Sequence, residues 1–494
     1  MSIFKRKDEK SIRSRNLRNR SNRSILHISY AVSLVFVLLM AYFLYFVFCG
    51  SQSVIGNTYN PRLDLFSERI VRGEIKSSEG EVLAYTEVDE TGGESRKYPF
   101  GELFCHMTGY STKGKTGMES LGNFYLLSSH INLIEQIRNE ILGEKSPGDN
   151  IWLTVSLELQ RTAYEALGDR RGAVMAMDPS TGRVLCMVSK PGFDPNSINE
   201  DWEEITSEEN DRGQLLNRAA QGSYPPGSIF KIFTVLEYMH EHPYDYQDFS
   251  YVCDGTYEDG EGNTISCYGN EAHGEQDLYE AFANSCNGAF AVIGAEIDIE
   301  KAMELNTELL FNSKLPLDLP YTRSSYSLTD SDTDFLKELT GMGQGNTLVS
   351  PAHMLMVTAA IANDGVLMKP MFTDRLESAG GEFFKSFKPE EYGRLMSRED
   401  AERLSEMMRL VVTEGTGSAF RDAAYEACVK TGSAEYDNGE RTHAWCLSFV
   451  RADGENAPSD IAVAVIVEDG KSGGATAAPI ARQVTDRLFE TFKN

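Results

Sequence analysis

The sequence predicts an α+β protein in which one antiparallel sheet is assembled from both ends of the folded region, with a helical insertion between them. Three observations predict this class. Apolar runs of strand length occur near residue 172 and again near residue 461, a mostly helical block separates them, and an uncharged apolar segment precedes them all. With 494 residues, the chain has room for two or three domains.

The first expected element is a membrane-spanning helix. Residues 1–24 form a basic tail, and residues 25–49 carry no Asp, Glu, Lys or Arg. About 20 apolar residues span a bilayer, and a basic flank stays in the cytoplasm. We therefore expect a single-pass anchor in the cell membrane, with the amino terminus cytoplasmic and the residues after Gly50 extracytoplasmic. A cleaved signal peptide is the alternative, but its apolar core is usually about 7–15 residues and ends in small residues, whereas this run ends in Phe48 and Cys49.

The next region, residues 50–149, is polar, contains many Gly and Ser residues and has no long apolar helix. This composition predicts a strand-rich pedestal or linker. The composition changes at Asn150, where we place the start of a main domain covering residues 150–494. Within it, residues 151–155 are expected to form a strand, and residues 157–167 an amphipathic helix.

The strands of the main sheet are predicted from both ends of this domain. Residues 172–177 and 183–188 are apolar runs joined by a turn sequence, which indicates a hairpin. Residues 428–433 and 444–450 flank a second turn at Asn438-Gly439. Residues 461–467 have no polar face and should form a central strand. Residues 480–492 close the chain as an amphipathic helix.

Charge and cysteine content exclude some classes of function. The net charge of −27 makes nucleic-acid binding improbable. The eight cysteines include no Cys-x-x-Cys pair and no Cys/His cluster of ligand spacing, so neither a metal site nor a cofactor is expected. Cys253 and Cys267 flank a loop rich in Gly and acidic residues. They form either a disulfide, if the compartment is oxidising, or two free thiols. Cys286 and Cys428 are interpreted as small packing residues.

A Ser-x-x-Lys sequence supplies the first catalytic candidates. The prolines before Gly227 cannot continue a helix, so a helix is expected to begin at Ser228, with Lys231 one turn further on the same side. This helix is apolar on nearly every face and should be buried. Burial lowers the pKa of a lysine, and such a lysine can activate a serine as a nucleophile. The motif alone is weak evidence, because residues 2–5 repeat it in the basic tail.

A second motif, Ser285-Cys286-Asn287, follows a short helical run at residues 278–283. A hydroxyl and an amide in this arrangement can relay protons and hold the backbone of a substrate. We therefore include Ser285 and Asn287 among the catalytic candidates.

A third motif, Lys430-Thr431-Gly432-Ser433, lies at a predicted strand edge. Its ammonium and hydroxyl groups suit a substrate carboxylate. Gly432 has no Cβ, so a peptide could lie against the strand. The backbone N–H groups of Ser433 and Ser228 could form an oxyanion hole. We assign all four residues of this motif to substrate binding.

The order and context of these three motifs resemble the class B penicillin-binding proteins, which are monofunctional peptidoglycan D,D-transpeptidases. Further segments carry the resemblance: residues 72–75 beside the anchor, residues 114–119 of the pedestal, residues 341–345, and residues 443–445 after the third motif. The chain departs from the family pattern at Ser77-Ser78, where an Asp-Arg pair is usual, and at Ser433, where threonine is more usual.

The resemblance implies a concrete activity on a penicillin-binding, serine β-lactamase-like transpeptidase domain. Ser228 would attack stem peptides ending in D-Ala-D-Ala and form an acyl-enzyme, with Lys231 as the base and Ser285 passing the proton to the leaving amine. β-Lactams would acylate Ser228. The resemblance also implies a SEDS-type glycan polymerase as a membrane partner.

Three alternatives remain. A D,D-carboxypeptidase would use the same residues with water as the acceptor. A β-lactam receptor would need a cytoplasmic signalling domain, and the tail is too short to be one. A non-enzymatic cell-surface interaction protein would not react with penicillin. The sequence leaves open whether the enzyme serves division, elongation or sporulation, and which amine is the acceptor.

Overall fold

The computed structural model describes residues 25–46, 66–436, 441–451 and 460–491. Within the first of these ranges, a helix spans Ile25–Tyr45, is 21 residues long and buries none of its side chains. Its length and composition fit the predicted anchor. Residues 47–49 of that anchor and the basic tail lie outside the described residues, as does the turn predicted at Asn438-Gly439. The orientation across a membrane stays a prediction.

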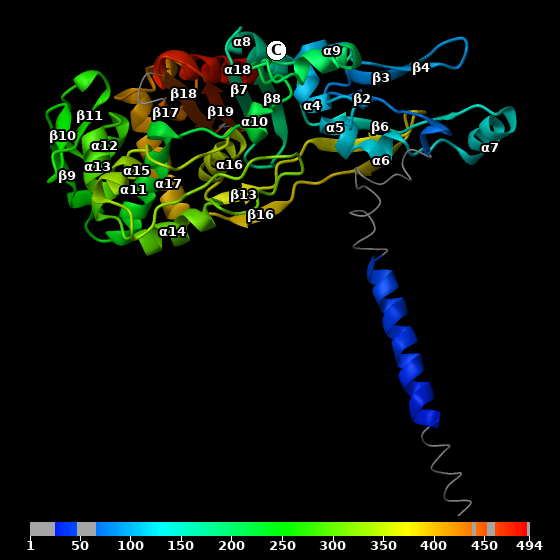
Figure 1. Ribbon diagram of the computed structural model, residues 1–494, viewed down its shortest axis with the longest axis horizontal. Coiled ribbons are helices and arrows are strands. Elements are labelled where there is room, and N and C mark those ends of the chain that lie inside the picture. Colours follow the sequence, from blue (N-terminus) through cyan, green and yellow to red (C-terminus); the bar gives the residue numbers. More distant parts are fainter. Residues whose placement is uncertain (1–24, 47–65, 437–440, 452–459, 492–494) are drawn as a thin grey trace, which may run out of the picture. The chain divides into compact units, whose positions relative to one another are not determined.

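The main sheet has five antiparallel strands in the order β17-β18-β19-β7-β8 (Figure 1). The predicted hairpin is β7 with β8, and the predicted central strand β19 is the middle strand of the sheet. The expectation of a sheet built from both ends of the domain is confirmed. The strands span β7 Gly172–Met177, β8 Val184–Lys190, β17 Ala427–Tyr436, β18 Arg441–Val450 and β19 Ile461–Val467.

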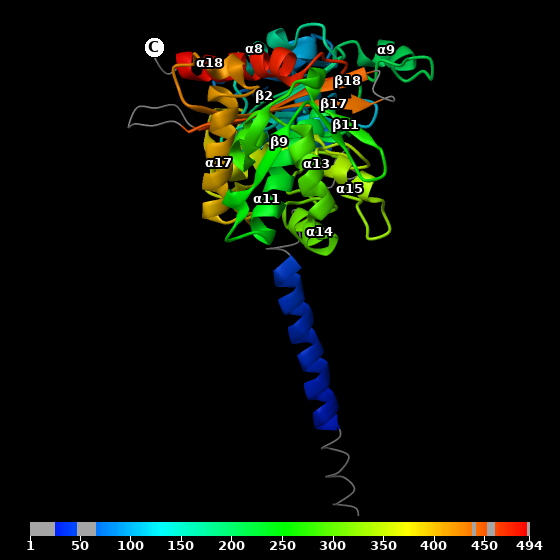
Figure 2. The same cartoon turned by 90° about the vertical axis from the view of Figure 1, so that its left-hand side faces the viewer.

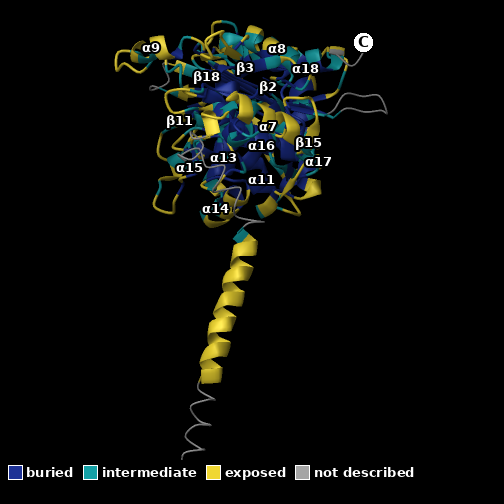
Figure 3. Cartoon of the chain, turned by 90° about the vertical axis from the view of Figure 1, so that its right-hand side faces the viewer, coloured by how far each residue is buried: buried dark blue, intermediate teal, exposed yellow. Residues whose placement is uncertain are grey.

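Helices cover both faces of this sheet. Along β19, Ala464 and Ile466 pack into one apolar cluster, and Val463 and Val465 pack into the other. The two sets alternate because successive side chains of a strand point to opposite faces. Helices α8 (Leu157–Leu167) and α18 (Ala478–Thr491) cover one face, as their sequences predicted. Helix α16 (Pro351–Ala362) covers the other and is buried along its whole length (Figure 3).

The predicted helical insertion lies between β8 and β17, and Figure 2 shows it facing the viewer. The helix expected to begin at Ser228 begins differently. A 3₁₀ turn, η3, covers Gly227–Phe230, and helix α11 covers Lys231–Glu241. The tighter turn arises because Gly227 adopts a left-handed φ of 55° immediately after Pro226. The main further helices are α12 Leu278–Ala283, α13 Asn287–Glu296, α14 Ile299–Glu308, α15 Asp334–Gly341 and α17 Arg398–Thr413.

Four short strands form two small antiparallel pairs beside this insertion. Strand β9 (Ser250–Cys253) pairs with β12 (Gly274–Asp277), and β10 (Thr256–Glu258) pairs with β11 (Thr264–Ser266). Together they occupy the stretch of chain between α11 and α12. Figure 2 shows β9 and β11 on the same side of the molecule as α13.

The pedestal contains a six-stranded mixed sheet in the order β15-β14-β6-β2-β3-β4. Strands β14 and β15 come from within the predicted main domain, and β6 pairs with both β2 and β14. The sheet therefore crosses the domain boundary expected between residues 149 and 150, which stays a prediction. The strands are β2 Ile75–Lys76, β3 Val82–Val88, β4 Glu94–Lys97, β6 Asn150–Leu153, β14 Thr373–Glu377 and β15 Phe383–Ser386.

The pedestal also contains short helices that the strand-rich prediction did not include. Two of them, α4 (Cys105–Thr108) and α5 (Gly117–Leu121), pack against each other. The others are α6 (Asn123–Leu126) and α7 (Leu133–Leu142). For α4, α5 and α6 their brevity explains the miss, because helices of four or five residues leave little periodicity in a sequence.

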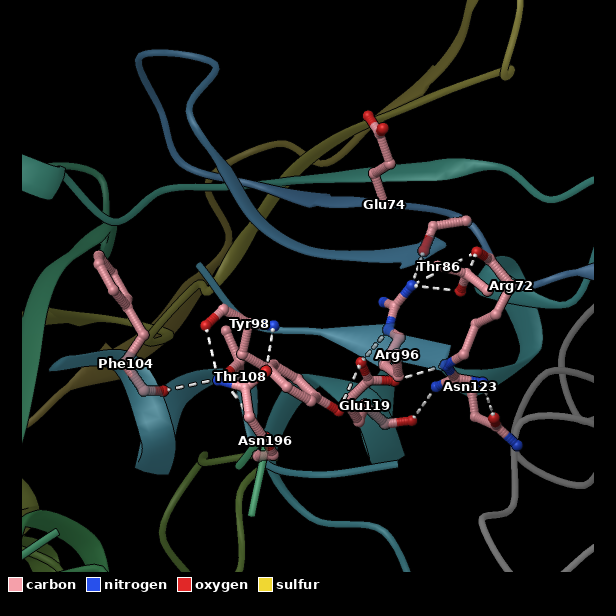
Figure 4. A network of polar contacts seen from close by, with 12 residues as sticks. Arg72, Glu74, Thr86, Arg96, Tyr98, Phe104, Thr108, Glu119, Asn123 and Asn196 are labelled. Atoms are coloured by element: carbon pink, nitrogen blue, oxygen red, sulfur yellow. Dashed lines mark hydrogen bonds and ion pairs between the residues drawn. The ribbon is translucent and has the colours of Figure 1, made fainter. Parts of the chain in front are cut away.

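A buried ion-pair network holds the start of the pedestal together (Figure 4). The Glu119 carboxylate on α5 is fully buried and pairs with Arg72 at 2.5 Å and Arg96 at 2.7 Å. Burial raises the pKa of the Glu119 carboxyl, but the two guanidinium charges lower it by more, so the carboxyl stays ionised. Arg72 also donates to the side-chain oxygen of Asn123. The network links residue 72 to two strands and two helices of the pedestal.

Candidate active site

The site is built where η3 packs against β17, the edge strand of the main sheet. This contact needs glycine on both sides. A Cβ on Gly227 would lie 2.7 Å from the Ser433 carbonyl oxygen, and a Cβ on Gly432 would lie 3.1 Å from the Ile229 nitrogen. Gly432 was expected to make room for a substrate. The structure instead shows that a side chain at this position would point toward η3, so Gly432 permits the packing that positions Ser228.

Lys231 is the first residue of α11 and is fully buried. Its ammonium donates to the carbonyl oxygen of Ser285 at 2.6 Å, to the side-chain oxygen of Asn287 at 2.8 Å, and to the Ser285 hydroxyl at 3.3 Å. Burial lowers the pKa of Lys231 to about 8. The first two predicted motifs therefore meet at this ammonium, which gives up its proton far more readily than an exposed lysine does.

Lys430 approaches the same hydroxyl from β17 and is also fully buried. Its ammonium donates to Ser285 Oγ at 2.9 Å and to the Thr431 carbonyl oxygen at 3.2 Å. Burial, and next the nearby charge of Lys231, lower the pKa of Lys430 far below its ordinary value. Within the described part of the chain, neither lysine forms an ion pair with a carboxylate. An anion placed beside these two buried lysines would favour their charged forms, so the site suits an anionic group.

The second motif lies at the junction of α12 and α13, and its last residue, Asn287, is the first residue of α13. Ser285 follows α12 with a left-handed φ of 58°, which is uncommon for a residue with a side chain. Cys286 then caps α13 by accepting a hydrogen bond from the Ala289 nitrogen at 3.5 Å. Backbone conformations of this kind persist where the surroundings hold them, and they cluster at functional sites. The turn places both Ser285 Oγ and its carbonyl oxygen on Lys231.

The other two residues of the third motif lie on the opposite face of β17 from Lys430. Thr431 Oγ1 lies 2.6 Å from the hydroxyl of Thr416, and Ser433 Oγ accepts from the Gly473 nitrogen at 3.3 Å. Thr416 was not predicted, because it belongs to no motif and follows α17. Only the tertiary fold identifies it.

The backbone of β17 leaves an open edge beside η3. With its side-chain amide oriented to satisfy both groups, Gln344 donates to the Glu435 carbonyl and accepts from the Glu435 nitrogen, at 3.2 and 3.1 Å. Alternate residues of an edge strand present their N–H groups to the same side. The N–H of Ser433, two residues earlier, therefore points to this open edge, away from β18.

A groove of about 1320 Å³ opens over these residues. Its lining contains six of the eight predicted site residues: Ser228, Ser285, Asn287, Thr431, Gly432 and Ser433. The other two, Lys231 and Lys430, are buried and reach Ser285. In the described part of the chain, the Ser228 hydroxyl has no hydrogen-bond partner and faces the groove. The fold thus gathers all eight predicted residues around one opening.

Trp445 holds the segment that precedes the nucleophile. Its indole nitrogen donates to the Pro225 carbonyl oxygen at 3.0 Å, and the ring is fully buried. His443 stacks on Tyr436 with 4.1 Å between ring centroids. These contacts give both residues a structural role at the edge of the site.

Comparison with known proteins identifies the family. The model for the penicillin-binding protein transpeptidase domain matches residues 172–486, well over half of the chain. The chain belongs to the penicillin-binding protein transpeptidase family. A second model, the penicillin-binding protein A dimerisation domain, matches residues 72–151. The resemblance drawn from the three motifs is confirmed.

Individual relatives agree with this assignment. This penicillin-binding protein is 28% identical to the peptidoglycan D,D-transpeptidase PbpA of Mycolicibacterium smegmatis, over 93% of this chain and 98% of that one. It is also similar to the D,D-transpeptidase domain of a peptidoglycan glycosyltransferase from Eggerthella lenta, with a TM-score of 0.75 and 28% identity over 86% of this chain and 99% of that one. Penicillin-binding protein A of M. tuberculosis, solved as a ceftriaxone acyl-enzyme, also has a TM-score of 0.75, with 26% identity and the same coverage.

One feature beside the active site was not predicted from the sequence. Cys253, Cys267, His273 and Cys286 place their potential ligand atoms within 4.8 Å of one another. No metal-ligand cluster was expected, because the four residues are far apart in sequence and fit no short motif. The Sγ atoms of Cys253 and Cys267 are 3.7 Å apart, so the two residues are thiols and not a disulfide. Cys286 was interpreted as a packing residue, but its sulfur also belongs to this cluster.

Proposed function

We propose that this penicillin-binding protein is a peptidoglycan D,D-transpeptidase that cross-links stem peptides through an acyl-enzyme on Ser228. One observation carries the proposal. Two buried lysines from different motifs both donate to the hydroxyl of Ser285, next to the groove that Ser228 faces. Such an arrangement supplies a base for a nucleophile and a path for a proton to a leaving group.

Acylation begins when Ser228 Oγ attacks the carbonyl carbon of the penultimate D-Ala and its proton passes to Lys231. The N–H groups of Ser228 and Ser433 hold the resulting oxyanion. The bond from carbon to the leaving nitrogen then breaks, and Ser285 gives its proton to that nitrogen and is reprotonated from the lysines. The products are free D-Ala and an ester on Ser228.

Deacylation reverses these roles. An amine of a neighbouring stem peptide attacks the ester carbonyl and loses a proton to the lysine and serine network. An amide bond forms, and Ser228 Oγ leaves and recovers its proton. Each cycle exchanges one amide bond for another, so the reaction needs no cofactor.

Recognition of the substrate carboxylate falls to the third motif. Lys430 is a buried lysine, and Thr431 and Ser433 carry hydroxyl groups on the groove. The protein has a net charge of −27, so its overall field does not attract a carboxylate. The hydroxyls of Thr431 and Ser433 and the amine of Lys430, whose charged form a nearby carboxylate would favour, must therefore provide that attraction.

β-Lactams are expected to enter the same groove, because they present a reactive amide and a carboxylate to the same groups. Ser228 would open the lactam ring, and the product would remain as an ester. The M. tuberculosis relative was solved as acyl-enzyme complexes with ceftriaxone, imipenem and penicillin G, which supports this expectation.

The location of the enzyme follows from its apolar helix. We place residues 25–49 in the cell membrane as a single-pass anchor, residues 1–24 in the cytoplasm, and the pedestal (50–149) and transpeptidase domain (150–494) outside it. The one described helix that is long and apolar enough to span a bilayer, Ile25–Tyr45, supports this placement. A SEDS-type glycan polymerase in the same membrane would contact the anchor and the pedestal.

A D-Ala-D-Ala thioester offered together with a D-amino-acid acceptor tests the proposal. We expect thioester consumption and an aminolysis product with the full-length protein in detergent. Ser228→Ala should lose both, and Ser223→Ala, which alters an exposed serine nearby, should keep both. Hydrolysis with no aminolysis product would favour the D,D-carboxypeptidase. No consumption, and no labelling by fluorescent penicillin, would favour the non-enzymatic protein.

A further inference from the structure

Three cysteines and a histidine meet beside the active site, each from a different part of the chain. Cys253 is the last residue of β9, Cys267 directly follows β11, and His273 directly precedes β12. Cys286 is the residue that caps α13. The pairing of β9 with β12 brings Gly274 opposite Cys253, which places the neighbouring His273 next to that cysteine. The backbone thus gathers these side chains without a short sequence motif.

The distances within the cluster match the edges of a coordination tetrahedron. Cys267 Sγ lies 3.7 Å from Cys253 Sγ and 3.8 Å from Cys286 Sγ, and His273 Nδ1 lies 3.3 Å from Cys253 Sγ. A tetrahedral zinc with bonds of about 2.3 Å to sulfur and about 2.0 Å to nitrogen separates two sulfurs by about 3.8 Å and a sulfur from a nitrogen by about 3.5 Å. Three of the six separations between the ligand atoms are therefore close to those that zinc imposes, and all four atoms lie within 4.8 Å of one another.

The burial of the cluster and the chemistry of its ligand atoms both favour zinc. The three cysteines are buried, and His273 is half-buried at the groove. Thiolates with an imidazole in a tetrahedral arrangement favour zinc over magnesium or calcium, which bind oxygen ligands. Cys286 Sγ also accepts a hydrogen bond from the Ala289 nitrogen, the kind of outer contact that orients a metal ligand.

We propose that Cys253, Cys267, His273 and Cys286 bind a structural zinc ion. Binding Zn²⁺ replaces the three thiol protons, which are released to solvent, and closes the site with four protein ligands. The proposal is independent of the acylation chemistry, because no atom of the cluster reacts with substrate.

Zinc at this site would also fix the second catalytic motif. Cys286 stands between Ser285 and Asn287, and both of these residues bond Lys231. Asn287 Nδ2 further donates at 2.8 Å to the carbonyl of Ser266, the residue before Cys267. A metal bonded to Cys267 and Cys286 therefore ties the loop of Ser285 to the small strand pairs. The cysteines are positioning residues for this loop.

The test is metal analysis of the full-length protein, purified in detergent with reductant and without a metal-affinity step. We expect one zinc per chain by mass spectrometry. After chelation, added Co²⁺ should give the visible and near-ultraviolet bands of tetrahedral cobalt bound to thiolates, and added Zn²⁺ should remove these bands and raise Tm. Cys253→Ser and Cys286→Ser should each lose most of the zinc, whereas Cys428→Ser, which alters a cysteine outside the cluster, should retain it.

Several results would overturn the proposal. One is wild-type protein that holds no zinc and gives no cobalt spectrum, a measurement that needs no variant to fold. Another is full zinc content in Cys253→Ser, and a third is a Cys253–Cys267 disulfide found in non-reduced protein from the cell envelope. Ser228→Ala should keep its zinc, so failure of the zinc site and failure of the transpeptidase activity are distinguishable.

Discussion

Lys430 donates a 2.9 Å hydrogen bond to the hydroxyl of Ser285. The Nζ atom of Lys231 lies 3.3 Å from the same oxygen, so one hydroxyl connects two buried lysines from different motifs. A hydroxyl can accept from one neighbour while donating to another. Ser285 is therefore placed to move a proton between Lys231 and the groove that Ser228 faces.

Removal of this hydroxyl should slow acylation and leave the fold largely intact. We expect Ser285→Ala to reduce the rate of acylation by penicillin by about 10²–10⁴-fold, the range of a lost general acid–base group. Stopped-flow or quenched labelling measures this rate. Ser266→Ala, which removes an exposed hydroxyl from the same groove, should react normally. An unchanged rate in Ser285→Ala would rule out the relay.

The acylation rate should depend on pH through Lys231. Only the neutral amine accepts the Ser228 proton, and burial lowers the pKa of Lys231 to about 8. The rate should therefore rise about tenfold per pH unit below this value and level off above it. The measurement is penicillin acylation from pH 5.5 to 9.5. A rate that does not change across pH 8 would contradict the assignment of Lys231 as the base.

The same pKa shift affects stability in a defined direction. The folded pKa of Lys231, about 8, lies below its ordinary value of 10.5. Between these values the unfolded chain binds more protons than the folded chain, so the contribution of Lys231 to the free energy of unfolding rises with pH across that window. Denaturant titrations at several pH values measure this effect. The free energy of unfolding of Lys231→Met should change less with pH across this window than that of the wild type. Equal pH sensitivity would contradict the burial of the ammonium.

Gly227 should tolerate no side chain. Its φ of 55° is left-handed, and a Cβ would lie 2.7 Å from the Ser433 carbonyl. Gly227→Ala should lower the free energy of unfolding by about 1–3 kcal/mol and slow acylation, because Ser228 must shift. Gly260→Ala is the matched control, since a Cβ there meets no atom within 4 Å. Normal acylation by a stable Gly227→Ala protein would show that the close packing of η3 on β17 is not required.

The Glu119 network should be necessary for the pedestal. Glu119→Ala leaves two guanidinium groups without their buried partner and should destabilise the protein by about 3–5 kcal/mol. Thermal unfolding compared with Glu135→Ala, which alters a more exposed acid on α7, measures the effect. A Tm equal to that of the wild type would show that the two arginines find other partners.

The sequence contained enough information to place the candidate site residues and the main sheet. Each of the three motifs is local, and the apolar patterns of 172–177, 183–188 and 461–467 predict their strands directly. The start of the helix at Ser228 was wrong by a 3₁₀ turn, because the short turn depends on how η3 meets β17.

Features that depend on distant parts of the chain were missed. Strand β14 joins the pedestal sheet by pairing with β6, more than two hundred residues away, and β15 follows by pairing with β14. No local pattern in the sequence records such a pairing. Thr416 reaches the groove through its contact with Thr431. The cluster around Cys267 was not predicted for the same reason. Its four members lie on separate parts of the chain, and their spacing resembles no short metal-binding motif.

The most direct test of the account is identification of the peptide that carries the label after reaction with penicillin. Full-length protein is treated with the antibiotic, digested, and analysed by tandem mass spectrometry. We predict a single modified residue, Ser228, and no modification in Ser228→Ala. A label on Ser285 or Ser433 in the wild type, or undiminished labelling of Ser228→Ala, would contradict the assignment of the nucleophile and with it the proposed chemistry.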